Sequence, residues 1–398
     1  MDGCDKKLNI GLGGRRLTDL VCALMFLLFA VLFLFDPHGL QLDLFYNRGS
    51  DLFADFLNSV RHIACGNPYT QGHIQPPLGY LVLLPFTLFA DFSLPLSELW
   101  NSSGALTAAA VFVAFSEAVL AFFLYIYIKR QYGKILPVWF WIIFSGVNFA
   151  AMERGTTVIL SAGCVAGFFA LYHTEKDFRR VAALFLLSAA GALKIYPAFF
   201  ALVLVKERDY KALLWCALFA VLLGLLPFFC FSGGMENIPV LLDNLGIYRK
   251  AFALSYADLR MIHVLRSDFF IAGAEKCYII FRRVVDVIVL ISCTAAFFSR
   301  RKDFLVFALA CCIALCPVGA MNYTLLYFAV PFADFYARAD KCRVAASGAL
   351  ALAVIYTPLR FVCQLNAFLT VLLCCAVLLA VLGVAIKSFV RSRMFVEV

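Results

Sequence analysis

Long apolar runs recur along the whole chain, and short clusters of basic residues separate them. The runs lie near residues 17–35, 77–90, 104–128, 135–151, 157–172, 181–205, 212–231, 279–299, 304–320, 321–336, 344–362 and 366–386. Charged residues are only 15% of the sequence, whereas a water-soluble fold usually carries about 25%. A span needs about 20 apolar residues, and several runs are shorter. We therefore expect an all-α polytopic integral membrane protein with about 10–13 transmembrane helices, some of them bent or half-crossing.

The positions of the charges predict the topology. The net charge of +9 does not indicate nucleic-acid binding, because the basic residues gather between the apolar runs. Basic residues precede the first run, which we interpret as an uncleaved span with a cytoplasmic amino terminus. The later basic clusters lie at 129–134, 176–180, 206–211, 300–302, 338–343 and 387–393. With these clusters inside, segments 37–76, 151–157, 194–197, 232–278 and 317–323 face outward.

The cysteines and histidines do not indicate a metal or disulfide framework. Most of the 15 cysteines lie inside apolar runs, where cysteine acts as a small hydrophobic residue. The sequence has no CxxC pair and only 5 histidines, so a zinc or iron–sulfur site is not expected. It also has no glycine-rich phosphate-binding loop, which argues against a soluble nucleotide site.

The first outward segment carries a polar stripe. Asp51, Asp55, Asn58 and His62 fall on one face of a predicted helix, with apolar residues on the other face. We expect this helix to lie in the membrane interface with its apolar face down. Two carboxylates one turn apart repel each other, and such a pair suits a general base. A solvated helix face is the alternative.

Three other outward segments carry cations. Lys194 interrupts a long apolar run and is either a functional residue or a snorkelling one, while Pro197 should kink or split the helix there. Arg154 can bind a lipid phosphate. An ion pair between the neighbouring Glu153 and another basic residue is the alternative interpretation. The basic residues of the 232–278 loop suggest an anionic ligand or lipid headgroups.

The order of these motifs resembles that of the polyprenol-phosphate-sugar-dependent glycosyltransferases of the GT-C fold. The motifs are Gly66-Asn67-Pro68-Tyr69, Pro76-Pro77-Leu78, Arg154-Gly155, Lys194-Ile195-Tyr196-Pro197 and Asn322-Tyr323. The closest resemblance is to glycosyltransferase family 87, and the glycosylphosphatidylinositol mannosyltransferases share the part from Arg154 to Pro197. The resemblance implies a single transmembrane GT-C-like domain over 1–398, with a motif-bearing module at 17–336 and a helical hairpin at 337–398.

The resemblance also implies roles for individual residues. A catalytic aspartate is expected in the first outer loop, with Asp51 and Asp55 as the two candidates. The donor phosphate would be bound by Arg154, Lys194, Arg249 and Arg260. Sugar and acceptor would be bound by Asn58, Tyr69, His73, Glu153, Tyr196, His263, Asn322 and Tyr323. Two carboxylates are too few ligands to predict a divalent metal, so no cofactor is assigned.

The implied activity is the transfer of a hexose, with mannose expected, from a polyprenyl-phosphate donor to a lipid-linked or cell-envelope glycan acceptor. It would take place on the outer face of the cell membrane, with inversion and with an aspartate as base. The leaving phosphate is a stable anion, so no protonating acid is needed, unlike in glycoside hydrolysis. A transporter or flippase of lipid-linked sugars is the alternative, and it would require repeats and deep ionisable residues in both halves, of which Lys194 is one. A structural membrane protein is a third reading.

Overall fold

The computed structural model describes residues 13–35, 52–252, 274–317, 322–356 and 363–394. Every regular element in these ranges is a helix, which confirms the all-α class. The chain divides into two compact units whose segments alternate along the sequence. Unit 1 comprises Met1–Pro37, Lys134–Val147 and Leu254–Val398, and unit 2 comprises His38–Gly133 and Asn148–Ala253. The single domain expected from the sequence stays a prediction.

Unit 1 is built from apolar helices whose lengths range from 6 to 32 residues. They are α1 (Gly14–Phe35), α7 (Val138–Ile143), α14 (Ala274–Phe298), α15 (Lys302–Leu315), η7 (Asn322–Phe328), α16 (Ala329–Arg338), α17 (Arg343–Ile355) and α18 (Cys363–Met394). Asp19 of α1 accepts hydrogen bonds from Trp141 of α7 and Tyr336 of α16, so one carboxylate ties three helices together. Among the described cysteines Cys342 takes part in a disulfide, whereas others, such as Cys311, are buried free thiols.

Unit 2 carries the motif-bearing segments. Its helices are α3 (Ala54–Ala64), η1 (Tyr69–Gln71), α4 (Pro77–Leu83), η2 (Leu84–Leu88), α5 (Leu96–Leu99), α6 (Ser103–Tyr132), α9 (Val158–Leu171), α10 (Asp177–Leu193), η3 (Tyr196–Ala201), α11 (Leu202–Lys206), α12 (Tyr210–Leu225), η4 (Leu226–Cys230), η5 (Gly234–Glu236) and α13 (Asn237–Phe252). Helix α8 (Gly146–Arg154) begins in unit 1 and ends in unit 2. Helices α6, α9, α10 and α12 pack side by side in that order.

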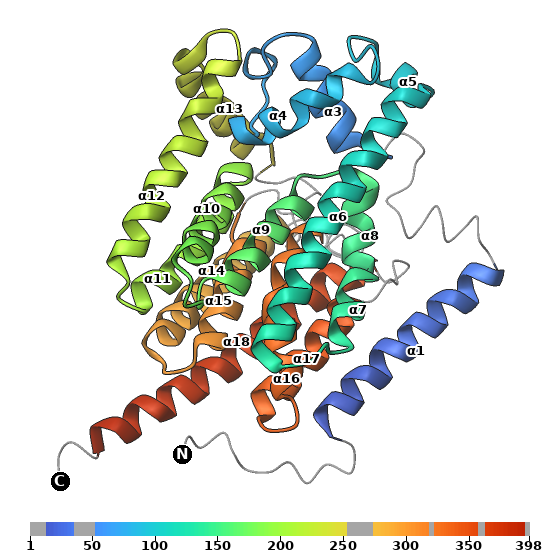
Figure 1. Ribbon diagram of the computed structural model, residues 1–398. Helices are drawn as coiled ribbons and strands as arrows, with labels where there is room; N and C mark the ends of the chain where they lie inside the picture. The colour runs from blue at the N-terminus through green and yellow to red at the C-terminus, as the bar shows by residue number, and fades with distance from the viewer. Residues whose placement is uncertain (1–12, 36–51, 253–273, 318–321, 357–362, 395–398) are drawn as a thin grey trace. The chain divides into compact units, whose positions relative to one another are not determined.

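These packed helices give unit 2 two ends. At one end, which we call the α3 end, the short helices α3, α4, α5 and α13 gather (Figure 1). At the other end α6 and α9 finish, and α10 and α12 begin. Helix α6 has 30 residues, so it is about 45 Å long. The second end holds the basic clusters of residues 129–130, 176–180 and 206–211, and we call it the basic end.

Helix α3 forms where the sequence predicts it, but protein covers its apolar face. Phe56 is fully buried, and its ring lies 5.4 Å from that of Phe112 in α6 and 5.5 Å from that of Phe86 in η2. Leu57 and Val60 are buried in the same cluster. The expectation that this face rests on the membrane interface is therefore wrong, because aromatic side chains of unit 2 supply the apolar surface that lipid was expected to supply.

The lengths of the apolar helices bear on the membrane spans. In the described part of the chain, Ser103–Tyr132, Tyr210–Cys230 and Leu369–Lys387 are long and apolar enough to cross a membrane by themselves. Shorter apolar helices lie at Pro77–Leu88, Val158–Leu171, Tyr196–Lys206 and Arg343–Ile355. The run 181–205 is split into α10, η3 and α11, as Pro197 predicts, because proline cannot donate the backbone hydrogen bond that a continuous helix requires.

Candidate functional site

An ion pair joins the two most distinctive charged motifs of the sequence. The Arg154 Nε donates to Asp55 Oδ1 at 3.1 Å, and Arg154 Nη2 contacts the same oxygen. Both side chains are half-buried. Asp55 lies in the first turn of α3 and Arg154 in the last turn of α8, so each charge also opposes the partial charge of its own helix end. The pair is thus held in place by two helices as well as by its own attraction.

The glycine after Arg154 makes this approach possible. Gly155 has φ +62°, a region that L side chains rarely adopt, and a Cβ built on it would lie 2.8 Å from Phe56 Cβ. Next to it, the Phe53 N–H donates to the Glu153 carbonyl at 2.6 Å, and Phe53 itself has φ 52°. A left-handed conformation at a residue other than glycine costs about 1–2 kcal/mol. The Arg-Gly motif therefore allows α8 to end directly against the start of α3.

Lys194 completes a group of three charges. It directly follows α10 in extended backbone, where burial lowers the pKa of its ammonium and the charge of Asp55 partly opposes that shift. Tyr196 begins η3 two residues later and is half-buried. One carboxylate therefore interacts with two basic residues that lie about 100 and 140 positions further along the sequence. We call Asp55, Arg154 and Lys194 the charged triad; its two basic side chains suit an anionic ligand.

The Gly-Asn-Pro-Tyr turn is fixed by asparagines of the following outer segment. Asn244 of α13 donates from Nδ2 to the carbonyls of Tyr69 and His73 at 2.8 and 3.0 Å. Asn67 donates to Asn237 Oδ1 at 2.6 Å. Asn237 and Asn244 are both buried, and the sequence reasoning did not single them out. Nothing in their spacing marks them, because their partners lie about 170 residues earlier.

The side chains of this turn have different environments. Tyr69 is fully buried, with its ring 5.7 Å from that of Tyr80 and 5.3 Å from that of Phe228, so it packs in the core. The His73 ring lies 3.6 Å from the His62 ring, and His62 Nδ1 contacts Gln71. Burial, with His62 beside it, lowers the pKa of His73 to about 4. Burial also lowers the pKa of His62. Both imidazoles are thus neutral at pH 7.

The other predicted site residues are placed less completely. Asn58 is half-buried on α3, and Glu153 is buried beside Arg154. Arg249 lies in α13 and Asn322 begins η7, although the structure describes neither side chain. Tyr323 is half-buried in unit 1. Asp51, Arg260 and His263 lie outside the described residues. The substrate roles assigned to all these residues stay predictions.

A further carboxylate, Glu117, lies deep in α6. Glu117 is near the midpoint of this 30-residue helix, and Asn148 Nδ2 donates to its Oε2 at 2.8 Å. The sequence reasoning named Lys194 as the deep ionisable residue and overlooked Glu117. The signal was available, because Glu117 is the only charged residue in the apolar run 104–128. Within the described ranges, no group of three or more His, Cys, Asp or Glu side chains is arranged to hold a metal ion.

The fold and the site together define a polytopic membrane protein with a charged site at one end of a helical unit. The model of glycosyltransferase family 87 matches residues 74–321, more than half of the chain. The chain therefore belongs to glycosyltransferase family 87 and is a membrane glycosyltransferase, as the motif order predicted. The match includes Arg154 and Lys194 and begins after Asp55. Neither the curated proteins nor the solved structures include a match to the chain.

Proposed function

We propose that this glycosyltransferase transfers a hexose from a polyprenyl-phosphate donor to a lipid-linked or cell-envelope glycan, and that the hexose is mannose. The observation that carries the proposal is the charged triad, in which Arg154 donates a hydrogen bond to Asp55 and the charge of Asp55 acts on Lys194. A donor of this class leaves as a lipid phosphate, whose negative charge grows in the transition state. Fixed cations at the point where charge develops stabilise a transition state more than a ground state.

The triad also suggests how a proton is taken from the acceptor. Both bonds from Arg154 to Asp55 fall on Oδ1, and we assign Oδ2 as the oxygen that would take a proton. In the proposed step an aspartate takes the acceptor hydroxyl proton while the hydroxyl oxygen bonds to the anomeric carbon. The bond from that carbon to the phosphate oxygen breaks, and the polyprenyl phosphate leaves with its electron pair. Asp51 and Asp55 are both kept as candidates for this base.

The reaction is proposed on the outer face of the cell membrane. Within unit 2, α9 starts three residues after Gly155 and ends at the basic end, and α10 runs from the basic end to Lys194. The charged triad and the basic clusters therefore lie at opposite ends of the same helices. By the positive-inside tendency the basic end is cytoplasmic. Family membership favours this enzyme over a transporter of lipid-linked sugars.

The proposal is tested with purified protein and polyprenyl-phosphate-mannose, by measuring release of polyprenyl phosphate in the presence of a membrane glycolipid extract. We expect Asp51→Asn or Asp55→Asn to lower the rate by about 100-fold or more. Asp91→Asn is the matched control, because Asp91 is exposed and bonds only to Ser93 nearby. Full activity in both Asp51→Asn and Asp55→Asn would exclude the proposed base, and no release by the unaltered protein would exclude the donor class.

A further inference from the structure

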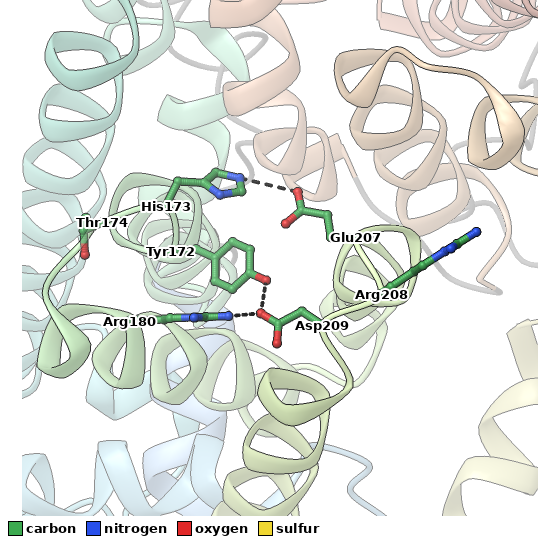
Figure 2. Close-up of a pocket in the computed structure, with 7 residues that line it drawn as sticks. All are labelled: Tyr172, His173, Thr174, Arg180, Glu207, Arg208 and Asp209. Atoms are coloured by element: carbon green, nitrogen blue, oxygen red, sulfur yellow. Dashed lines mark hydrogen bonds and ion pairs between the residues drawn. The ribbon is translucent and has the colours of Figure 1, made fainter.

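Two adjoining hollows lie at the basic end of unit 2, away from the charged triad. The first has a volume of about 460 Å³ and is lined by Tyr172, His173, Thr174, Arg180, Glu207, Arg208 and Asp209 (Figure 2). The second has a volume of about 380 Å³ and is lined by Tyr127, Arg130, Gln131, Phe169, Ala170, His173, Thr174, Glu175, Lys176 and Arg179. His173 and Thr174 belong to both, so the two hollows are continuous at the α9–α10 turn.

The acidic groups of the first hollow are occupied by neighbouring side chains. Asp209 Oδ2 accepts a hydrogen bond from the Tyr172 hydroxyl at 2.6 Å and contacts Arg180, and both partners reach it across the hollow (Figure 2). Burial opposes ionisation of Asp209, but the bonds from Tyr172, Ala212 and Arg180 outweigh it and lower its pKa. Glu207 lies 3.5 Å from the His173 ring. These acids therefore do little to neutralise the cations of the second hollow.

The second hollow, in contrast, has surplus positive charge. Arg130, Lys176 and Arg179 line it against the single acid Glu175. Arg130 is steadied by a bond of 3.0 Å from its Nη1 to the Ala170 carbonyl, and the Arg179 guanidinium lies 5.7 Å from the centre of the Phe178 ring. Three cations that come from α6 and from the start of α10 thus converge on one concave site. Such an arrangement suits a phosphate group.

An apolar stripe on α10 begins at Phe178, whose ring lies 5.7 Å from the Arg179 guanidinium. Phe178, Val181 and Phe185 recur at helical spacing, and 67%, 45% and 45% of their respective surfaces are exposed. The stripe starts next to Arg179 and runs in the direction of the α3 end. Because Arg179 lines the hollow and also packs on Phe178, an amphiphile could place its headgroup on the cations and its chain around α10 on the stripe.

We propose that the hollow lined by Arg130, Lys176 and Arg179 binds the phosphate of an anionic phospholipid, with one acyl chain lying along Phe178, Val181 and Phe185. The site is separate from the charged triad and does not depend on the proposed donor or acceptor. A free phosphate ion offers the same headgroup chemistry but makes no use of the apolar stripe. A merely solvated basic face would not distinguish these cations from others at the same end.

The test measures binding of phosphatidylglycerol to the purified full-length protein in detergent by native mass spectrometry. The altered protein is the double variant Lys176→Gln/Arg179→Gln. The matched control is Lys129→Gln/Lys211→Gln, which removes two exposed charges from the same end without altering a residue that lines either hollow. Each lysine or arginine near a lipid surface contributes about 1 kcal/mol of binding free energy. We therefore expect the altered protein, which loses two, to bind phosphatidylglycerol about 30-fold more weakly. The control should stay within about twofold of the unaltered protein.

Two further arms identify the source of the phosphate and guard against misfolding. Phosphatidylcholine and inorganic phosphate, each at the concentration of phosphatidylglycerol, should compete at least tenfold less well for the site. The charge-conserving variant Lys176→Arg/Arg179→Lys should bind phosphatidylglycerol nearly as the unaltered protein does. Equal losses in the two glutamine double variants, or competition by inorganic phosphate equal to that by phosphatidylglycerol, would overturn the proposal. A loss in the charge-conserving variant as large as that in the glutamine variant would also overturn it.

Discussion

Replacing Gly155 by alanine should destabilise unit 2 and disturb the charged triad at the same time. Gly155 has φ +62°, and its added Cβ would lie 2.8 Å from Phe56 Cβ. The Phe56 Cβ is fixed to the α3 backbone, so the contact cannot be relieved by a side-chain rotation. Either α3 or the end of α8 must move, and Asp55 and Arg154 sit on those two elements.

The expected cost has two parts. A left-handed backbone conformation costs an alanine about 1–2 kcal/mol. Overpacking of a filled core costs about 1–3 kcal/mol more. Together these predict a loss of about 2–5 kcal/mol in the free energy of unfolding for Gly155→Ala. The matched control is Gly224→Ala in α12, where the added Cβ would meet nothing within 4 Å, and which should be neutral or stabilising by up to about 1 kcal/mol.

The measurement is denaturant unfolding of the two purified variants in the same detergent, followed by fluorescence, together with glycosyl transfer under conditions where both remain folded. Gly155→Ala should unfold at a markedly lower denaturant concentration and should lose transfer activity even where it is folded. If Gly155→Ala and Gly224→Ala unfold at the same denaturant concentration, then the close approach of α8 to α3 is wrong, and so is the role given to the Arg-Gly motif.

Two further predictions concern the outer turn. Asn244→Leu removes two hydrogen bonds to the turn carbonyls and should cost about 2–3 kcal/mol of stability. The control Asp243→Asn, on the exposed side of α13, should cost little. Equal midpoints of thermal unfolding for the two variants would contradict this prediction. The pKa of His73 is lowered to about 4, so the unfolded chain, with an ordinary value near 6.5, binds the proton more tightly. Protonation therefore favours the unfolded chain, and the free energy of unfolding should fall as the pH drops from about 6.5 towards 4. His73→Gln should reduce this loss between pH 7 and pH 5, and an unchanged pH profile of the midpoint would contradict the assignment.

Much of the helical framework could be predicted from the sequence. The apolar runs mark nearly every long helix, and the run 181–205 divides near Pro197 because proline removes a backbone hydrogen-bond donor in the middle of the run. The period of the apolar residues also predicted α3. The sequence could not show what covers the apolar face of α3, because Phe56 meets Phe86 and Phe112 only after the chain has folded back twice.

The candidate site was predictable where a residue type is costly in its surroundings. Lys194 interrupts an apolar run, and Arg154 precedes a glycine between two runs, so both are conspicuous. That both residues interact with Asp55 was not predictable, because they lie about 100 or more positions away from it in the sequence. Asn244 and Asn237 left no signal at all, because buried asparagines in an amphipathic helix look the same in sequence as solvated ones.

The central claim is that Asp55 and Arg154 act together on the lipid phosphate donor. A double-mutant cycle of Asp55→Asn and Arg154→Gln tests it most directly, with kcat/KM for release of polyprenyl phosphate as the measured quantity. We predict that each single variant loses about 100-fold or more and that the double variant is little worse than the poorer single one, because both changes remove the same interaction. Losses that multiply, or a single variant with unchanged kcat/KM, would contradict the claim.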